Sequence, residues 1–203
     1  MFADFVFPDG NEEKFIEIAI KLGISKLYFI YDSEDKKKNN IKNSEFGRNK
    51  HINIRIGFIP NKKTSNLEKS ELMIAKSSDN DRFLIESGKL NLIYGFEQAT
   101  RKDFMSQKAS GLNHIICEAA NKNKVAIGFS YSSIINEPGF KKSVILGRMM
   151  QNIMLCRKYK VRALIGSFSS DPYMLRSPHD LISLFSTLGM DKKKSISSLN
   201  SSF

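Results

Sequence analysis

The chain has 203 residues, and its 32 Lys and Arg against 21 Asp and Glu give a formal net charge of +11. Hydrophobic residues make up 41 per cent, an ordinary proportion for one globular domain, and the longest apolar runs fall well short of the about 20 residues that span a bilayer. These values exclude a membrane-spanning protein and favour a polyanionic partner, although a genome rich in lysine codons would raise the charge as well.

Seven short runs rich in β-branched and aromatic residues predict strands along the chain. The first, FADFVF, reads as a strand and not as a signal peptide, because it has no basic start and no cleavage site. The runs lie at residues 2–7, 26–31, 52–58, 71–76, 90–94, 124–129 and 162–167. Helical patterns fit between several of them, which indicates an α/β fold with parallel strands. Seven such strands suit a closed or nearly closed barrel better than an open sheet.

The first helix is expected to run from an Asn11 cap to a stop at Gly23. A second is expected after Ser110, with an outward face at His114, Glu118 and Lys122. Its buried stripe would be Leu112, Ile115, Ile116, Ala119 and Ala120.

A long helix is predicted from Phe140 to Cys156, inside a stretch from Pro138 to Ser170 that contains bases and no acids. At 100° per residue its apolar residues gather on one side. That side holds Leu146, Met149, Met150, Ile153 and Cys156, and the opposite side holds Lys141, Arg148, Gln151 and Asn152. The basic outer side fits either a phosphate-binding surface or a solvated face.

The last predicted helix starts at Ser177-Pro178 and ends at Gly189, because Ser caps helices and Pro suits the first helical position. Arg176 stands just before it, where a guanidinium beside free backbone N–H groups would bind a phosphate. The alternative role for Arg176 is a structural salt bridge to Asp171 or Asp180.

Residues 1–190 are expected to form the single domain, and the Ser- and Lys-rich tail at 191–203 is expected to be flexible. Segments 32–50 and 60–70 are too polar to pack and read as surface insertions. Cys117 and Cys156 lie among apolar neighbours and read as free, buried thiols. A reduced, cytoplasmic location follows.

Several motifs together resemble the ribonuclease P protein component 3 family. They are SGLNH at 110–114 preceded by RKD at 101–103, KVAIGFS at 124–130, NIMLCRKYKV at 152–161 and DPYMLRSPHDLISL at 171–184. The opening FADFVFP is similar as well, so the resemblance extends from Phe2 to Met190, whereas segment 32–50 and the tail match no family pattern.

The resemblance implies a TIM-like barrel related to the polymerase-and-histidinol-phosphatase hydrolases, acting as a protein subunit of an RNA enzyme. The RNA would do the cleaving, with its own Mg²⁺, and would remove the 5′ leader of precursor tRNA. The protein itself would bind no cofactor and no metal and would have no catalytic residues. Its partners would be the ribonuclease P RNA, protein component 2 and other subunits, with precursor tRNA contacted indirectly. The RNA-binding role carries over to Arg101, Lys102, Lys108, Arg148, Lys158 and Arg176.

Two other functions stay open. A stand-alone metal-dependent phosphoesterase would need several His and carboxylate ligands that converge on divalent ions, but the three histidines His51, His114 and His179 are far apart in the sequence. Asp4 and Glu97 could be remnants of such a site. A generic RNA-binding barrel would show salt-sensitive binding without preference for one folded RNA.

Overall fold

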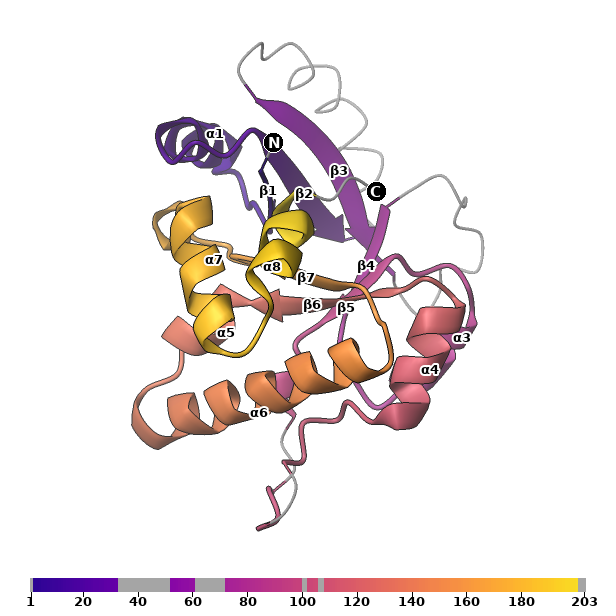
Figure 1. The fold of residues 1–203 in the computed structure, drawn as a ribbon. Coiled ribbons are helices and arrows are strands. Elements are labelled where there is room, and N and C mark those ends of the chain that lie inside the picture. Colours follow the sequence, from indigo (N-terminus) through magenta and orange to yellow (C-terminus); the bar gives the residue numbers. More distant parts are fainter. Residues whose placement is uncertain (1, 33–51, 61–71, 100–101, 106–107, 201–203) are drawn as a thin grey trace.

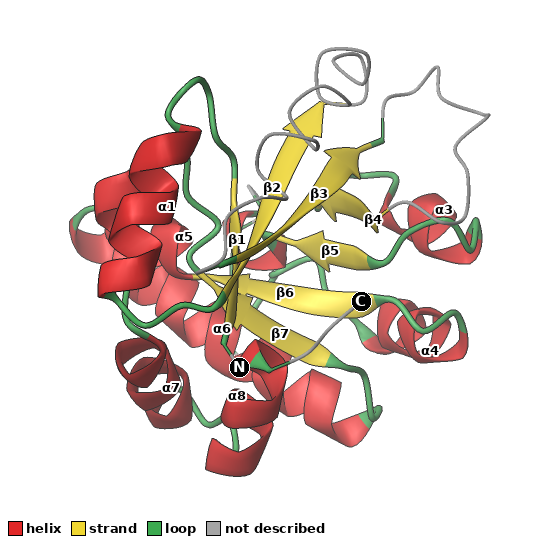
Figure 2. Ribbon diagram, turned by 90° about the horizontal axis from the view of Figure 1, so that it is seen from above, coloured by secondary structure: helices red, strands yellow, loops and turns green. Residues whose placement is uncertain are grey.

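The computed structural model describes residues 2–32, 52–60, 72–99, 102–105 and 108–200 (Figure 1). Its centre is one sheet of seven strands in which every strand pairs in parallel with the next one along the chain. The strands are β1 (Ala3–Val6), β2 (Lys26–Asp32), β3 (Asn53–Ile59), β4 (Leu72–Lys76), β5 (Leu92–Tyr94), β6 (Ala126–Ser130) and β7 (Ala163–Gly166). All seven predicted strands are confirmed, and helices surround much of the sheet (Figure 2).

The sheet curls until its first and last strands meet. A single bridge joins Val6 to Ser169, and the amide of Phe168 donates to the carbonyl of Phe5 at 2.9 Å. The carboxylate of Asp4 accepts from the amide and the hydroxyl of Ser167, at 2.6 and 2.5 Å. The barrel is therefore nearly closed, as the strand count predicts, and a side chain completes the seam between β1 and β7.

Aromatic rings fill the inside of the barrel. Phe5 stacks on Tyr28 and on Phe168, with ring centroids 4.8 and 5.1 Å apart, and Phe168 stacks on Tyr94 at 4.8 Å. A Cβ on Gly128 would come within 3.0 Å of the Phe168 ring, so the glycine gives the ring its space. Apolar residues on the other face of the strands form the larger core beneath the helices.

The helices follow the strands in chain order. They are α1 (Glu12–Lys21), α3 (Asp81–Glu86), α4 (His114–Lys122), α5 (Tyr131–Ile135), α6 (Gly139–Lys158), α7 (Pro178–Thr187) and α8 (Lys192–Leu199), with 3₁₀ turns η2 (Phe96–Gln98) and η3 (Pro172–Met174). Among the described residues, no helix combines the length and the apolar character that crossing a membrane requires. Cys117 and Cys156 are free and buried, as predicted.

Two helix starts differ in their capping. Ser177 accepts a hydrogen bond from the amide of Asp180 and caps α7, which confirms the expected start. Asn11 precedes α1, but its side chain makes no cap hydrogen bond; its oxygen accepts from the amide of Asp9, and its amide group donates to the carbonyl of Ser170. Asn11 therefore ties the chain before α1 to the segment after β7.

The predicted buried stripe of α4 is partly wrong. The side chain of Asn113 accepts from the amide of Ile116 at 3.0 Å and caps the helix, so α4 starts at His114 and residues 111–113 lie outside it. Leu112 is buried from that loop, whereas Ile115 is 44 per cent exposed and Cys117 takes the inward position. Because α4 starts at His114, Leu112 cannot belong to its buried face, which consists of Ile116, Cys117 and Ala120.

The predicted faces of α6 are wrong at three positions. Arg148 and Asn152, expected outside, are buried, and Met150, expected inside, is exposed. The reason is a second covering: η2, Asp103 and Ser110 contact this side of α6, and the hydroxyl of Ser110 donates to Asn152 at 2.6 Å. The helix is therefore enclosed by the barrel on one side and by this chain segment on another.

The tail expected to be flexible contains α8. Asp191 caps this helix by accepting from the amides of Lys193 and Lys194, and Leu199 is buried. The expected flexibility of the tail stays a prediction. Most of segments 32–50 and 60–70 lies outside the described residues.

Candidate nucleic-acid interface

Arg148 joins α6 to the segment that contains three of the other predicted binding residues. Its Nε donates to Asp103 at 2.9 Å, and its Nη1 donates to the carbonyls of Glu97 and Ala99. Only 6 per cent of its side chain is exposed. The guanidinium therefore points into the protein and fixes the loop instead of facing solvent.

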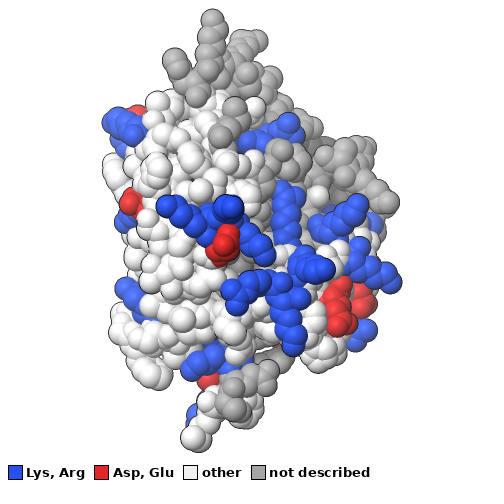
Figure 3. Space-filling model, in the orientation of Figure 1, with Lys and Arg blue, Asp and Glu red and all other residues white. Residues whose placement is uncertain are grey.

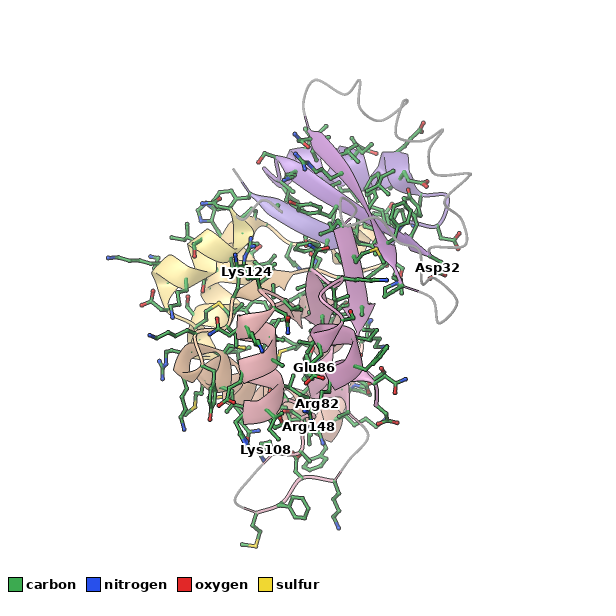
Figure 4. All side chains as sticks on the ribbon, turned by 90° about the vertical axis from the view of Figure 1, so that its right-hand side faces the viewer. Asp32, Arg82, Glu86, Lys108, Lys124 and Arg148 are labelled. Atoms are coloured by element: carbon green, nitrogen blue, oxygen red, sulfur yellow. The ribbon has the colours of Figure 1, made fainter. Side chains whose placement is uncertain are left out.

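Lys102 and Lys108 lie on this loop and are exposed. The Nζ of Lys108 lies 3.8 Å from Oδ2 of Asp103. The backbone amide of Lys108 donates to Oε1 of Gln151 on α6, and Nε2 of Gln151 donates to the carbonyl of Lys108. With Asp103 and residues 109–113, the two lysines line an open hollow beside α6, and Figure 4 shows Lys108 and Arg148 at the same end of the molecule. Arg101, the remaining predicted residue of this segment, lies outside the described residues.

The electrostatics of this loop depend on Asp103. Burial raises the pKa of its carboxyl, but hydrogen bonds from the Ala109 amide and from Arg148 outweigh burial, and the pKa lies below its ordinary value. Asp103 is therefore ionised at neutral pH and neutralises much of the charge that Arg148 brings. The exposed positive charge of the loop belongs to the lysines.

Arg176 lies at the carboxyl end of the barrel, beside the start of α5. Its Nε donates to the hydroxyl of Tyr131 at 3.0 Å, and its Nη1 donates to the carbonyls of Tyr173 and Leu175. Its guanidinium carbon also lies 5.2 Å from the centroid of the Tyr131 ring. The salt bridge considered for Arg176 is absent among the described residues, so its charge is not neutralised by Asp171 or Asp180.

The N-terminus of α7 offers fewer donors than the sequence suggests. Ser177 occupies the amide of Asp180, Pro178 has no N–H, and the carboxylate of Asp180 accepts from the Ser177 hydroxyl at 2.8 Å. A phosphate at this place would therefore depend on the Arg176 side chain more than on the helix end.

Lys158 is exposed at the last turn of α6, with its Nζ 5.5 Å from the Tyr159 ring centroid. It lies near the amino end of β7, at the opposite end of the barrel from Arg176. The predicted residues thus fall in three places: the loop beside α6, the α5 and η3 corner, and the end of α6. The last place also carries Arg157, Lys160 and Arg162, which belong to the acid-free stretch 138–170. Lys194 joins them from the tail, where the KKK sequence was the signal that the expected flexibility of residues 191–203 concealed. Lys and Arg gather over this face in Figure 3.

Two buried carboxyl groups lie near strand ends: Asp4, at the start of β1, faces Ser167 just after β7, and Glu97 lies in η2 after β5. Burial raises the pKa of Asp4 to about 6 against hydrogen bonds from Ser167 and Phe5, and burial raises the pKa of Glu97 to about 7. Neither oxygen of Glu97 has a hydrogen-bond partner in the described part of the chain, although Ser133 and the Ser130 amide lie near enough to moderate the rise. Both groups therefore favour their protonated, neutral forms relative to exposed carboxylates.

A metal site would need several ligands in one place. Within the ranges that the structure covers, no three His, Cys, Asp or Glu side chains come together in a way that could hold a metal ion. His114 and His179 are exposed, and His51 falls outside those ranges. The expectation that the protein binds no metal stays a prediction.

A family model described as RNase P subunit p30 matches residues 101–202. Two curated relatives are both named ribonuclease P protein component 3. The one from Methanococcoides burtonii is 36 per cent identical over 46 per cent of this chain and 39 per cent of its own length, and the one from Thermococcus kodakarensis is 33 per cent identical over 59 and 51 per cent. The chain thus matches about half the length of these relatives or less.

Solved structures share the fold over nearly the whole chain. One chain of a cryo-EM structure titled archaeal ribonuclease P with mature tRNA superimposes with a TM-score of 0.75 at 17 per cent identity, covering 97 per cent of this chain and 87 per cent of that one. A crystal structure of an uncharacterised protein gives a TM-score of 0.56 at 6 per cent identity, over 98 and 72 per cent. These likenesses support the barrel architecture from β1 to α8.

Proposed function

Because the chain belongs to the RNase P subunit p30 family, we propose that it is protein component 3 of a ribonuclease P and supports the RNA of that enzyme in removing the 5′ leader of precursor tRNA. The family match over residues 101–202 carries this proposal. That region begins before α4 and includes α6, α7 and α8, so it contains most of the basic surface described above.

The proposed binding mode is electrostatic. A formal net charge of +11 attracts a polyanion, and lysines and arginines that neutralise phosphates release the counterions of the nucleic acid. We assign phosphate contacts to Lys102, Lys108, Lys158 and Arg176, with Arg101 as a further candidate. Arg148 is assigned a positioning role, because its guanidinium is bonded to Asp103 and to two carbonyls.

We further propose that the protein has no catalytic site of its own and that the Mg²⁺ of the reaction is held by the RNA. The stacked rings of Phe5, Phe168 and Tyr94 inside the barrel support this, since they occupy the place where a substrate would enter. Asp4 supports it too, because its carboxylate is bonded to Ser167 across the seam.

The partners that we propose are the ribonuclease P RNA, protein component 2 and other protein subunits, with precursor tRNA contacted indirectly. We place the complex in the cytoplasm, in keeping with two free, buried cysteines.

Reconstitution tests the proposal. The pure protein, ribonuclease P RNA from the same organism and component 2 are combined with precursor tRNA and Mg²⁺, and the released leader is measured. We expect cleavage that depends on the RNA and is stimulated by the protein. Robust cleavage by nuclease-treated protein alone would favour the phosphoesterase. Binding that does not distinguish ribonuclease P RNA from tRNA or duplex DNA, together with no stimulation, would favour the generic RNA-binding barrel.

A further inference from the structure

Five described helices end with a residue in the left-handed backbone region. Three of these residues are glycines: Gly23 after α1, Gly88 after α3 and Gly189 after α7, with φ between +67° and +99°. The other two are lysines: Lys124 after α4 at φ +57° and Lys160 after α6 at φ +54°. Glycine is the favoured residue at this position because a Cβ crowds the following carbonyl oxygen.

The turn after the helix is the same for both residue types. After α7, the amide of Met190 bonds to the carbonyl of Phe185 at 3.0 Å, and after α6, the amide of Val161 bonds to the carbonyl of Cys156 at 2.9 Å. Glycine would therefore fit at Lys160 and, by the equivalent Val125 to Ala120 bond, at Lys124. Two lysines hold a conformation that this chain gives to glycine elsewhere.

The two lysines are neighbours across the sheet. Strands β6 and β7 pair in parallel with Ile127 opposite Ala163. Lys124 and Lys160 each precede those residues by three positions, so they stand at matching places before adjacent strands, at the amino end of the barrel. Figure 4 shows where Lys124 lies.

Other cations complete this end of the barrel. Arg157 and Lys160 from the end of α6, Arg162 before β7 and Lys194 on α8 line one hollow of about 280 Å³. Asp191 also lines it, but its carboxylate is bonded to the backbone amides that start α8. The hollow is slightly smaller than the about 300 Å³ of the smallest pockets for small molecules. Figure 3 shows the predominance of basic side chains on this face.

We infer that the amino-end cluster, defined as Lys124, Arg157, Lys160, Arg162 and Lys194, binds backbone phosphates of RNA. The inference rests on the proposed function and extends the single contact at Lys158 into a surface at the opposite end of the barrel from Arg176. A solubilising lysine has no need of a position where its backbone is disfavoured, whereas a phosphate contact gives a function to the side chain that causes the strain. Lysine suits this task as a point charge that needs no fixed bonding plane.

The test replaces both strained lysines with glycine. In the Lys124→Gly and Lys160→Gly double variant the backbone strain disappears, so the melting temperature is expected to stay or to rise. Its affinity for transcribed ribonuclease P RNA is expected to fall, and the slope of log affinity against log salt is expected to decrease by about 1.5 to 2, for two lost phosphate contacts. Weaker binding by a more stable protein cannot be attributed to misfolding.

A matched control removes equal charge at the far end of α6. The control carries Lys141→Gln and Lys142→Gln, at positions about 25 Å from Lys158 along α6 at 1.5 Å per residue. It is expected to change the salt slope by less than the glycine variant does. The inference is overturned if the slope of log affinity against log salt is unchanged in the glycine variant, or if both variants lose the same amount of slope. It is also overturned if inorganic phosphate competes for the protein but the slope for RNA stays the same. If the glycine variant shows a reduced salt slope with every RNA tested, and the parent protein does not prefer ribonuclease P RNA, the phosphate-binding cluster is supported and the proposed function is refuted.

Discussion

Replacing Arg148 with methionine separates a structural role from an RNA contact. Methionine keeps the apolar stem of the side chain inside the protein and removes the guanidinium. Asp103 then loses its partner at 2.9 Å, and the carbonyls of Glu97 and Ala99 lose their donors. Breaking a buried ion pair costs about 3 to 5 kcal/mol.

The lower end of that range applies here. Asp103 keeps 16 per cent of its side chain exposed and retains Lys108 at 3.8 Å, so water and the lysine solvate part of its charge. We expect Arg148→Met to lower the free energy of unfolding by about 3 kcal/mol and the melting temperature by about 6 to 12 °C, for a chain of this length. Urea denaturation followed by circular dichroism measures the first value.

A second variant provides the control. Asp103→Asn combined with Arg148→Met removes the stranded charge, so the pair is expected to cost less than the sum of the single changes. The reasoning is refuted if Arg148→Met unfolds at the same urea concentration as the parent while its RNA affinity falls, since the guanidinium would then face the RNA.

Three further changes test other parts of the structure. The pKa of Glu97 is raised to about 7 from 4.5, so the folded protein binds a proton that the unfolded chain releases; this stability is present below pH 4.5 and is lost as the pH rises through about 7. Between pH 4.5 and 8, the free energy of unfolding of Glu97→Gln should therefore rise relative to that of the parent by up to about 3 kcal/mol, as measured by urea titrations. A difference between the two proteins that does not change with pH would contradict the raised pKa. Leu112→Ala should cost about 2 to 5 kcal/mol of stability through lost packing, measured in the same way; a cost below 1 kcal/mol would place Leu112 outside the core. Arg176→Ala should weaken RNA binding by about 1 to 3 kcal/mol in a filter-binding assay, and wild-type binding and cleavage would remove Arg176 from the interface.

The sequence predicts the barrel well because its signals are local. Runs such as KLYFIY before a polar stretch and KVAIGF after a helix end identify strands, and their succession with helices requires parallel pairing. The start of α7 follows from Ser177 and Pro178 alone. These features depend on neighbouring residues, and a single sequence contains them.

The faces of α6 could not be predicted in the same way. Periodicity assumes one buried side, whereas the segment around Asp103 and Ser110 covers a second side of the helix. That segment is distant from α6 in the sequence and has no regular secondary structure, so no periodic pattern predicts its contact with the helix. Burial of Arg148 follows from it, and a residue expected to face RNA becomes the one that fixes the loop.

The order of the strands also sets an order of assembly. Each pairing from β1 to β7 joins segments that follow one another, but closure joins Asp4 to Ser167, 163 positions later. Contacts at such separation form late. During synthesis, nearly the whole domain must therefore leave the ribosome before the second edge of β1 meets the segment after β7. Until then Asp4 is ionised in water on an open edge, and a charge there discourages pairing with other chains. The same carboxyl group would thus protect the open edge of the incomplete sheet from aggregation and later join β1 to the end of β7.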